Sequence, residues 1–161
     1  MKILLDIDGV MIPARPWQPY EIGVDGFGMF NKIAVECLNK VLKESIEPEI
    51  ILTTSHKHNF NLDKWLEIFN SRGVLITEIN RLSTDSLKLN RKEEIEAWYL
   101  KNQNVPFIVI DDDKRLNAFD LDFKDDYLIL TNATIGLNII STEEAIKKIN
   151  HLQEKFFSNP I

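Results

Sequence analysis

The feature that most limits how this chain can fold is a set of five short apolar runs, separated by segments with helical periodicity. Turn-forming or polar residues bound each run, a pattern typical of parallel strands buried on both faces. The predicted strands cover residues 3–7, 49–53, 74–77, 107–110 and 127–130.

Four intervening segments carry apolar side chains every three to four residues, as amphipathic helices do. Each begins at a residue that can cap a helix: Asn31, Asn61, Asn90 and Ser141. In the last two, Glu93 and Glu144 complete a capping-box spacing. Strands thus alternate with helices, which predicts an α/β fold: a doubly wound parallel sheet of about five strands with helices on both faces.

The length of 161 residues is that of one ordinary domain. Two irregular segments interrupt the alternation, 11–30 and 78–89, and long loops in compact domains are usually functional. We therefore expect a single domain over residues 1–161, with a short flap at about 11–30.

Composition narrows the class of protein. A net charge of -6 argues against a large non-specific surface for nucleic acid, which needs clustered Lys and Arg. Cys37 is the only cysteine, so no intramolecular disulfide can form. No apolar stretch approaches the ~20 residues that span a membrane, and acidic residues interrupt the first apolar run at once. We expect a soluble cytoplasmic protein.

Acidic residues follow two of the predicted strands. Asp6 and Asp8 follow the first, and Asp111, Asp112 and Asp113 follow the fourth. An isolated Asp-x-Asp-Gly is equally well a solvated turn. Two acidic clusters at the same carboxyl edge of a sheet would repel one another without a cation between them, and carboxylate oxygens suit Mg²⁺. The pair of clusters therefore predicts a magnesium site.

Hydroxyl and basic residues lie where they could hold a phosphoryl group. Thr53 and Thr54 end the second strand, and hydroxyls with free backbone N–H groups form anion cradles. Lys88, Arg91 and Lys92 lie at or just before a helix start, where the macrodipole does not favour a cation. Each of the three can neutralise phosphate, and an exposed basic helix start is an equal alternative.

In this order and context the chain resembles the haloacid dehalogenase (HAD) superfamily. Five segments look like the bacterial family named for HAD domains of Swiss Army Knife RNA repair proteins: LLDIDGVMIP, EIILTTSHKH, NRKEEIEAW, FIVIDDD and YLILTNATIGLN. The resemblance implies a HAD-like fold and a Mg²⁺-dependent phosphatase that works through an aspartyl phosphate.

The resemblance also implies roles for individual residues. Asp6 would attack phosphorus, and Asp8 would act as general acid and base. Thr53, or Thr54 if the strand register differs by one, would bind phosphate. Asp111 and Asp112 would hold the metal with Asp6 and the backbone carbonyl of Asp8. The lysine that the superfamily uses maps onto Lys92 or, with one residue of slippage, onto Arg91.

The segments that could carry a cap domain are about twenty and a dozen residues long, too short for an independent domain. An open site suits a macromolecular phosphate, and the family name favours RNA or DNA ends. Trp17 and Tyr20 could stack on a base, or could anchor the loop. His56 and His58 are expected to face solvent.

Two other functions stay open from the sequence. One is a small-molecule phosphatase or nucleotidase whose site is closed by oligomerisation, and the other is a non-catalytic phosphate- or metal-binding regulatory module. The oligomeric state is not predicted.

Overall fold

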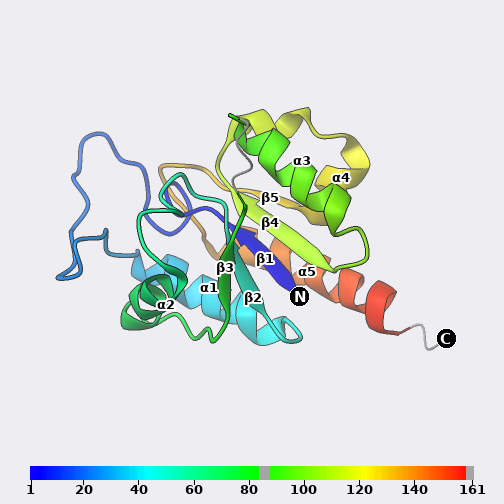
Figure 1. Ribbon diagram of the computed structural model, residues 1–161, viewed down its shortest axis with the longest axis horizontal. Coiled ribbons are helices and arrows are strands. Elements are labelled where there is room, and N and C mark those ends of the chain that lie inside the picture. The colour runs from blue at the N-terminus through cyan, green and yellow to red at the C-terminus, as the bar shows by residue number, and fades with distance from the viewer. Residues whose placement is uncertain (84–87, 159–161) are drawn as a thin grey trace.

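A parallel β-sheet forms the centre of the computed structural model, which describes residues 1–83 and 88–158 (Figure 1). Its strands are β1 (Lys2–Leu5), β2 (Glu49–Leu52), β3 (Ile79–Arg81), β4 (Phe107–Asp111) and β5 (Leu128–Leu130). They lie in the order β3-β2-β1-β4-β5, and every neighbouring pair is parallel. The carboxyl ends of the strands therefore meet at one edge, with β1 in the middle.

Helices cover both faces of this sheet (Figure 1). They are α1 (Lys32–Glu44), α2 (Leu62–Ser71), α3 (Arg91–Lys101), α4 (Leu121–Tyr127) and α5 (Ile139–Phe157), with a short 3-10 helix η1 (Lys114–Ala118). Helices α1, α2 and α5 pack on one face, and α3, η1 and α4 on the other. The predicted α/β fold, a doubly wound five-stranded parallel sheet, is confirmed.

The central strand shows why the sheet needs two helical layers. Ile3 and Leu5 belong to the core beneath α1, α2 and α5, whereas Leu4 belongs to the core beneath α3 and α4. All three side chains are fully buried. Because successive side chains of a strand point to opposite faces, an unbroken apolar run can only be buried between two layers.

Asparagine caps start the helices largely where predicted. Asn31, Asn61 and Asn90 each accept backbone N–H bonds at a helix start. The last helix begins three residues earlier than predicted, because its cap is Asn138 and Ser141 closes the capping box from the third helical position. None of the helices in the described part of the chain is long and apolar enough to cross a membrane.

The third strand was predicted in the wrong place. The run 74–77 forms no strand: Val74 and Ile76 are buried, but Leu75 between them is 78% exposed as the chain leaves α2. The strand β3 instead lies within the segment predicted as a loop, 78–89, of which residues 84–87 lie outside the described residues. It is an edge strand without a fully buried residue, so it has no continuous apolar run.

Residues 11–30, called the flap below, form an extended irregular segment beside the sheet edge (Figure 1, blue). Arg72, just after α2, holds one end of the flap. Its guanidinium donates to both carboxylate oxygens of Asp25 at 2.6 and 2.9 Å and to the carbonyls of Phe27 and Gly28 at 3.0 Å. Within residues 1–83 and 88–158 there is no large cap domain, as predicted.

Trp65 of α2 offers a test of the core. Its indole is fully buried, lies edge-on to Phe27 and Phe60, and donates to the carbonyl of Lys57 at 3.1 Å. Trp65→Ala should therefore lower the free energy of unfolding, measured in urea, by about 3–5 kcal/mol. Trp17→Ala, at a residue 73% exposed, should change it by no more than about 0.5 kcal/mol. Equal losses would contradict this account of the core.

Candidate active site

Three carboxylates meet at the carboxyl edge of the sheet. Asp6 directly follows β1, Asp111 ends β4 and Asp112 follows it. Strands β1 and β4 pair in register, and the Asp6 backbone N–H donates to the carbonyl of Ile110 at 3.0 Å. One oxygen from each carboxylate lies within 4.8 Å of the others. The pairing of two buried strands thus forces these acids together.

A tight turn after Asp6 makes room for Asp112. Gly9 adopts φ +75°, and a Cβ at this position would lie 2.1 Å from the Asp112 carboxylate. The Gly9 carbonyl accepts a 2.8 Å hydrogen bond from the hydroxyl of Thr131, which fixes the turn against the end of β5. A side chain at position 9 would therefore displace a carboxylate of the cluster.

Arg91 supplies the positive charge closest to the acids. It is the first residue of α3, and its Nη1 lies 2.5 Å from Asp111 Oδ2 and 3.4 Å from Asp6 Oδ1. The capping box of Asn90 and Glu93 fixes where the helix begins and so where Arg91 points. Lys92 points elsewhere: it pairs with Glu96 at 3.3 Å and lies over the ring of Phe119.

The two threonines after β2 differ in what they contact. Thr53 is fully buried, and its Oγ1 lies 3.1 Å from Arg91 Nη1 and 3.4 Å from Asp111 Oδ2. Thr54 is equally buried, but its hydroxyl accepts from the backbone N–H of His56 at 3.3 Å. Thr53 is thus the hydroxyl beside the carboxylates, and Thr54 shapes the following turn.

The side chain of Asp8 is not part of the cluster of three carboxylates, and it contacts His56, which was expected to face solvent. His56 Nε2 lies 2.8 Å from Asp8 Oδ2. The imidazole ring packs edge-on against Phe27 of the flap, and its Nδ1 lies 3.3 Å from the Asn59 side chain. The side chain of His56 stays 35% exposed, but its contact with Asp8 was not predicted; the position of His56 just after β2 was the signal that could have found it.

A second buried ion pair supports Arg91 and was not predicted. Lys57 is 5% exposed, and its Nζ lies 3.2 Å from Glu94 Oε1. The other oxygen of Glu94 lies 4.0 Å from Arg91 Nε, so Glu94 faces both cations. Nothing in the sequence pattern distinguishes Lys57 from its exposed neighbours.

Burial disfavours the ionised forms of Asp6, Asp111 and Asp112. It raises the pKa of Asp6, an effect that the nearby Arg91 opposes and that Asp112 reinforces. Burial and the charge of Asp6 together raise the pKa of Asp111 to about 6, again against Arg91. The pKa of Asp112 is also raised by burial and then by Asp111. A further cation would stabilise all three charged forms.

The donor set fits a hard divalent cation. Carboxylate oxygens are the ligands that Mg²⁺ prefers, and Asp6, Asp111 and Asp112 each offer one to the same space. Asp113 does not join this cluster, since both its carboxylate oxygens accept hydrogen bonds from the guanidinium of Arg115. Asp6, Thr53, Arg91, Asp111 and Asp112 thus lie together, whereas Lys88 is exposed and Lys92 faces Glu96.

A family match over most of the chain places it in the HAD superfamily, and the parallel sheet with its acidic edge agrees with this. More narrowly, the family described as "HAD domain in Swiss Army Knife RNA repair proteins" matches residues 2–140, and the chain belongs to this family.

Comparison with curated proteins finds no match. Among solved structures, a similar one is "Structure of putative 3-deoxy-D-manno-octulosonate 8-phosphate phosphatase from Vibrio cholerae". It is 13% identical, with a TM-score of 0.41, and the likeness covers 99% of this chain and 87% of that chain. So distant a likeness bears on neither substrate nor mechanism.

The raised pKa of Asp111 predicts an unusual pH dependence of stability in chelator. Between pH about 4, where unfolded Asp ionises, and about 6, the folded protein keeps a proton that the unfolded chain has released. The contribution of Asp111 to the free energy of unfolding must therefore fall as pH rises through this window. Urea unfolding with EDTA at a series of pH values measures the slope, and Asp111→Asn should reduce it.

Asp113→Asn is the matched control. The hydrogen bond from Arg115 lowers the pKa of Asp113, so in the upper part of this window, above about pH 5, its carboxylate is ionised in both the folded and the unfolded state. The variant should keep the parent's slope even if its overall stability changes. An Asp111→Asn variant with the same slope as the parent between about pH 5 and pH 6 would contradict the interpretation of the cluster.

Proposed function

We propose that this chain is a Mg²⁺-dependent phosphohydrolase in which Asp6 is the nucleophile and Asp8 the general acid and base. The observation that carries the proposal is the convergence of Asp6 with Asp111, Asp112 and Arg91 at one sheet edge. A carboxylate nucleophile facing a phosphate dianion needs positive charge around it, and this edge provides an arginine and a metal-type donor set.

The reaction would proceed in two displacements. In the first, an Asp6 carboxylate oxygen bonds to phosphorus, and the bond from phosphorus to the leaving oxygen breaks as Asp8 gives that oxygen a proton. In the second, Asp8 takes a proton from water, which attacks the aspartyl phosphate, releases inorganic phosphate and restores Asp6. Thr53 and Arg91 would hold the oxygens of the phosphoryl group throughout.

Asp6, Asp111, Asp112 and the backbone carbonyl of Asp8 would hold the Mg²⁺. When bound, the ion offsets the repulsion between carboxylate and phosphate. His56 would orient Asp8, because its Nε2 lies 2.8 Å from the Asp8 carboxylate and Phe27 fixes the ring. The acid and its partner are thus both held by contacts within the chain.

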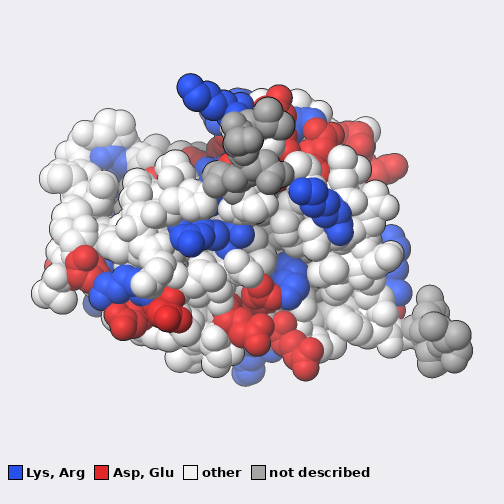
Figure 2. Space-filling model, viewed as in Figure 1, with Lys and Arg blue, Asp and Glu red and all other residues white. Residues whose placement is uncertain are grey.

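The substrate class that we propose is a phosphorylated nucleic-acid end, RNA or DNA. The site would belong to a single domain in which the flap is the cover, so much of a long substrate could lie outside it. The family description, which refers to RNA repair, supports this class. On the face in Figure 2, Lys and Arg side chains alternate with acidic ones and form no large basic surface, so recognition would depend on local contacts.

The proposal is tested with p-nitrophenyl phosphate and with oligonucleotides phosphorylated at either end. The protein should release phosphate in Mg²⁺ and stop reversibly in EDTA. Asp6→Asn keeps the shape of the side chain but not the nucleophile, so turnover should fall at least roughly 1,000-fold while the circular dichroism spectrum stays unchanged. Full activity in the variant would exclude the covalent mechanism.

The same screen separates the alternatives. A clear preference in kcat/KM for mononucleotides over chain ends would indicate a small-molecule phosphatase or nucleotidase. Binding of Mg²⁺ and phosphate without turnover would indicate a regulatory module.

The role of Asp8 predicts a dependence on the leaving group. Asp8→Asn should slow hydrolysis of a nucleoside or alkyl phosphate by about 10²–10⁴-fold, because a poor leaving group must be protonated as it departs. The loss should be much smaller with p-nitrophenyl phosphate, whose phenol is already acidic. Comparing kcat/KM across aryl phosphates of graded acidity measures this, and a uniform loss would count against the role.

A further inference from the structure

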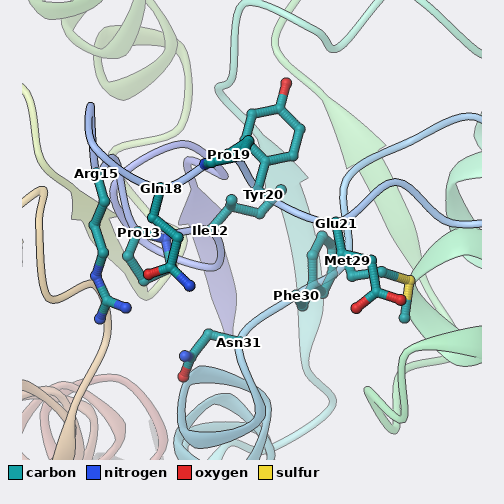
Figure 3. Close-up of a pocket in the computed structure, with 10 residues that line it drawn as sticks. All are labelled: Ile12, Pro13, Arg15, Gln18, Pro19, Tyr20, Glu21, Met29, Phe30 and Asn31. Atoms are coloured by element: carbon teal, nitrogen blue, oxygen red, sulfur yellow. The ribbon is translucent and has the colours of Figure 1, made fainter.

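A groove under the flap begins beside Asp8. It consists of two adjoining cavities of about 250 and 300 Å³, which share Ile12, Pro13, Arg15, Gln18 and Tyr20 (Figure 3). Asp8 lines the second cavity, and the first continues to Asn31 at the start of α1. The groove therefore leads away from the proposed general acid.

This position identifies the part of a substrate that the groove would hold. In the proposed mechanism Asp8 gives its proton to the leaving oxygen, so the leaving group must lie on the Asp8 side of the phosphorus atom. A groove that opens at Asp8 would thus receive the remainder of the substrate and not the transferred phosphoryl group.

Arg15 is the cation of this groove, and its backbone and Nε are fixed. Its Nε donates to the carbonyl of Thr134 at 3.1 Å, and the backbone N–H of Ala14 donates to the carbonyl of Ala133 at 2.7 Å. A guanidinium has five N–H donors, of which this bond uses one. Among residues 1–83 and 88–158, no carboxylate lies within ion-pair distance of Arg15. A half-buried guanidinium without an acidic partner is suited to bind an anion from outside.

The two ends of the groove differ in the residues that line them. Figure 3 shows Gln18 on the same side as Arg15, with Glu21 and Met29 together on the other side. The carboxylate of Glu21 therefore lies away from the guanidinium, and the cavity that Asp8 lines contains Arg15 and Gln18 but not Glu21. Tyr20, which is 56% exposed, lines both cavities.

We propose that Arg15 binds the phosphodiester next to the terminal phosphate of an oligonucleotide, with Gln18 as a second donor. This inference rests on the proposed function and adds the residue that would distinguish a nucleic-acid chain end from a monomer. A phosphodiester offers two oxygens to the forked guanidinium, and bidentate pairing of this kind is the strongest that arginine makes. The exposed rings of Tyr20 and Trp17 give the adjoining bases a surface on which to stack.

The experiment compares two dinucleotides that carry the same terminal phosphate. In one the internucleotide link is the natural charged phosphodiester, and in the other it is an uncharged methylphosphonate. The parent protein with Mg²⁺ should hydrolyse the charged dinucleotide with a kcat/KM about tenfold or more higher, because a hydrogen-bonded charge pair is lost in the other. Arg15→Ala should abolish this difference, and Arg15→Lys should restore part of it.

Two controls isolate the effect. Lys43→Ala removes the same charge from an exposed position in the last turn of α1 and should leave the preference intact. The substrate p-nitrophenyl phosphate has no second anion, so any loss of its turnover in Arg15→Ala measures only how far Arg15 holds the flap, and the loss with the charged dinucleotide should exceed it about tenfold. An equal loss on both substrates would mean that Arg15 only holds the flap in place, and the proposal would be wrong.

Binding to the Asp6→Asn variant separates this proposal from the proposed function. There, adding Arg15→Ala should raise the Kd of the charged dinucleotide about tenfold and leave that of the methylphosphonate unchanged. Arg15-dependent binding without turnover in the parent would contradict the phosphatase and keep the subsite. Turnover without any preference for the charged link, or a preference for an acidic phosphopeptide, would overturn the subsite alone.

Discussion

Repulsion among three carboxylates at the centre of the sheet edge is the constraint on which the rest of the site depends. The register of β1 and β4 places Asp6 beside the end of β4, and both strands are buried, so the acids cannot separate without breaking the sheet. The start of α3 brings Arg91 to this edge, and Gly9 leaves room for Asp112. The local structure around the edge thus accommodates or offsets negative charge that the strand pairing imposes.

Two arginines hold the flap against the rest of the domain, one near each end. Arg72 holds the end near Asp25, and Arg15 holds the other end against the loop after β5. At the end held by Arg72, Phe27 packs on His56, which contacts Asp8. A displacement of this part of the flap would therefore move the histidine that contacts the proposed general acid.

The sequence predicts the fold and the acidic edge well because both depend on burial pattern. Four of the strands have apolar runs that two helical layers must cover, and acids directly after such strands can only lie at the shared edge. The position of the edge strand β3 could not be predicted in this way, because neither of its faces is fully buried and it has no continuous apolar run. The cap Asn90 was predicted, but successive helical residues point about 100° apart, so choosing Arg91 over Lys92 also needed the packing of α3 against the sheet. The contact between His56 and Asp8 could not be predicted, because it depends on how the flap packs against His56.

The charge balance of the site explains why an arginine is well suited to the start of α3. Three carboxylates and one guanidinium leave two negative charges, while the neighbouring Lys57 and Glu94 neutralise each other. A single divalent cation would bring the edge to neutrality before a phosphate arrives. A lysine can lose its proton when buried, whereas a guanidinium stays charged at any physiological pH. With Arg91 fixed as a permanent cation, the charge of the edge changes only with its carboxylates, and a metal ion bound by them would favour their ionised forms.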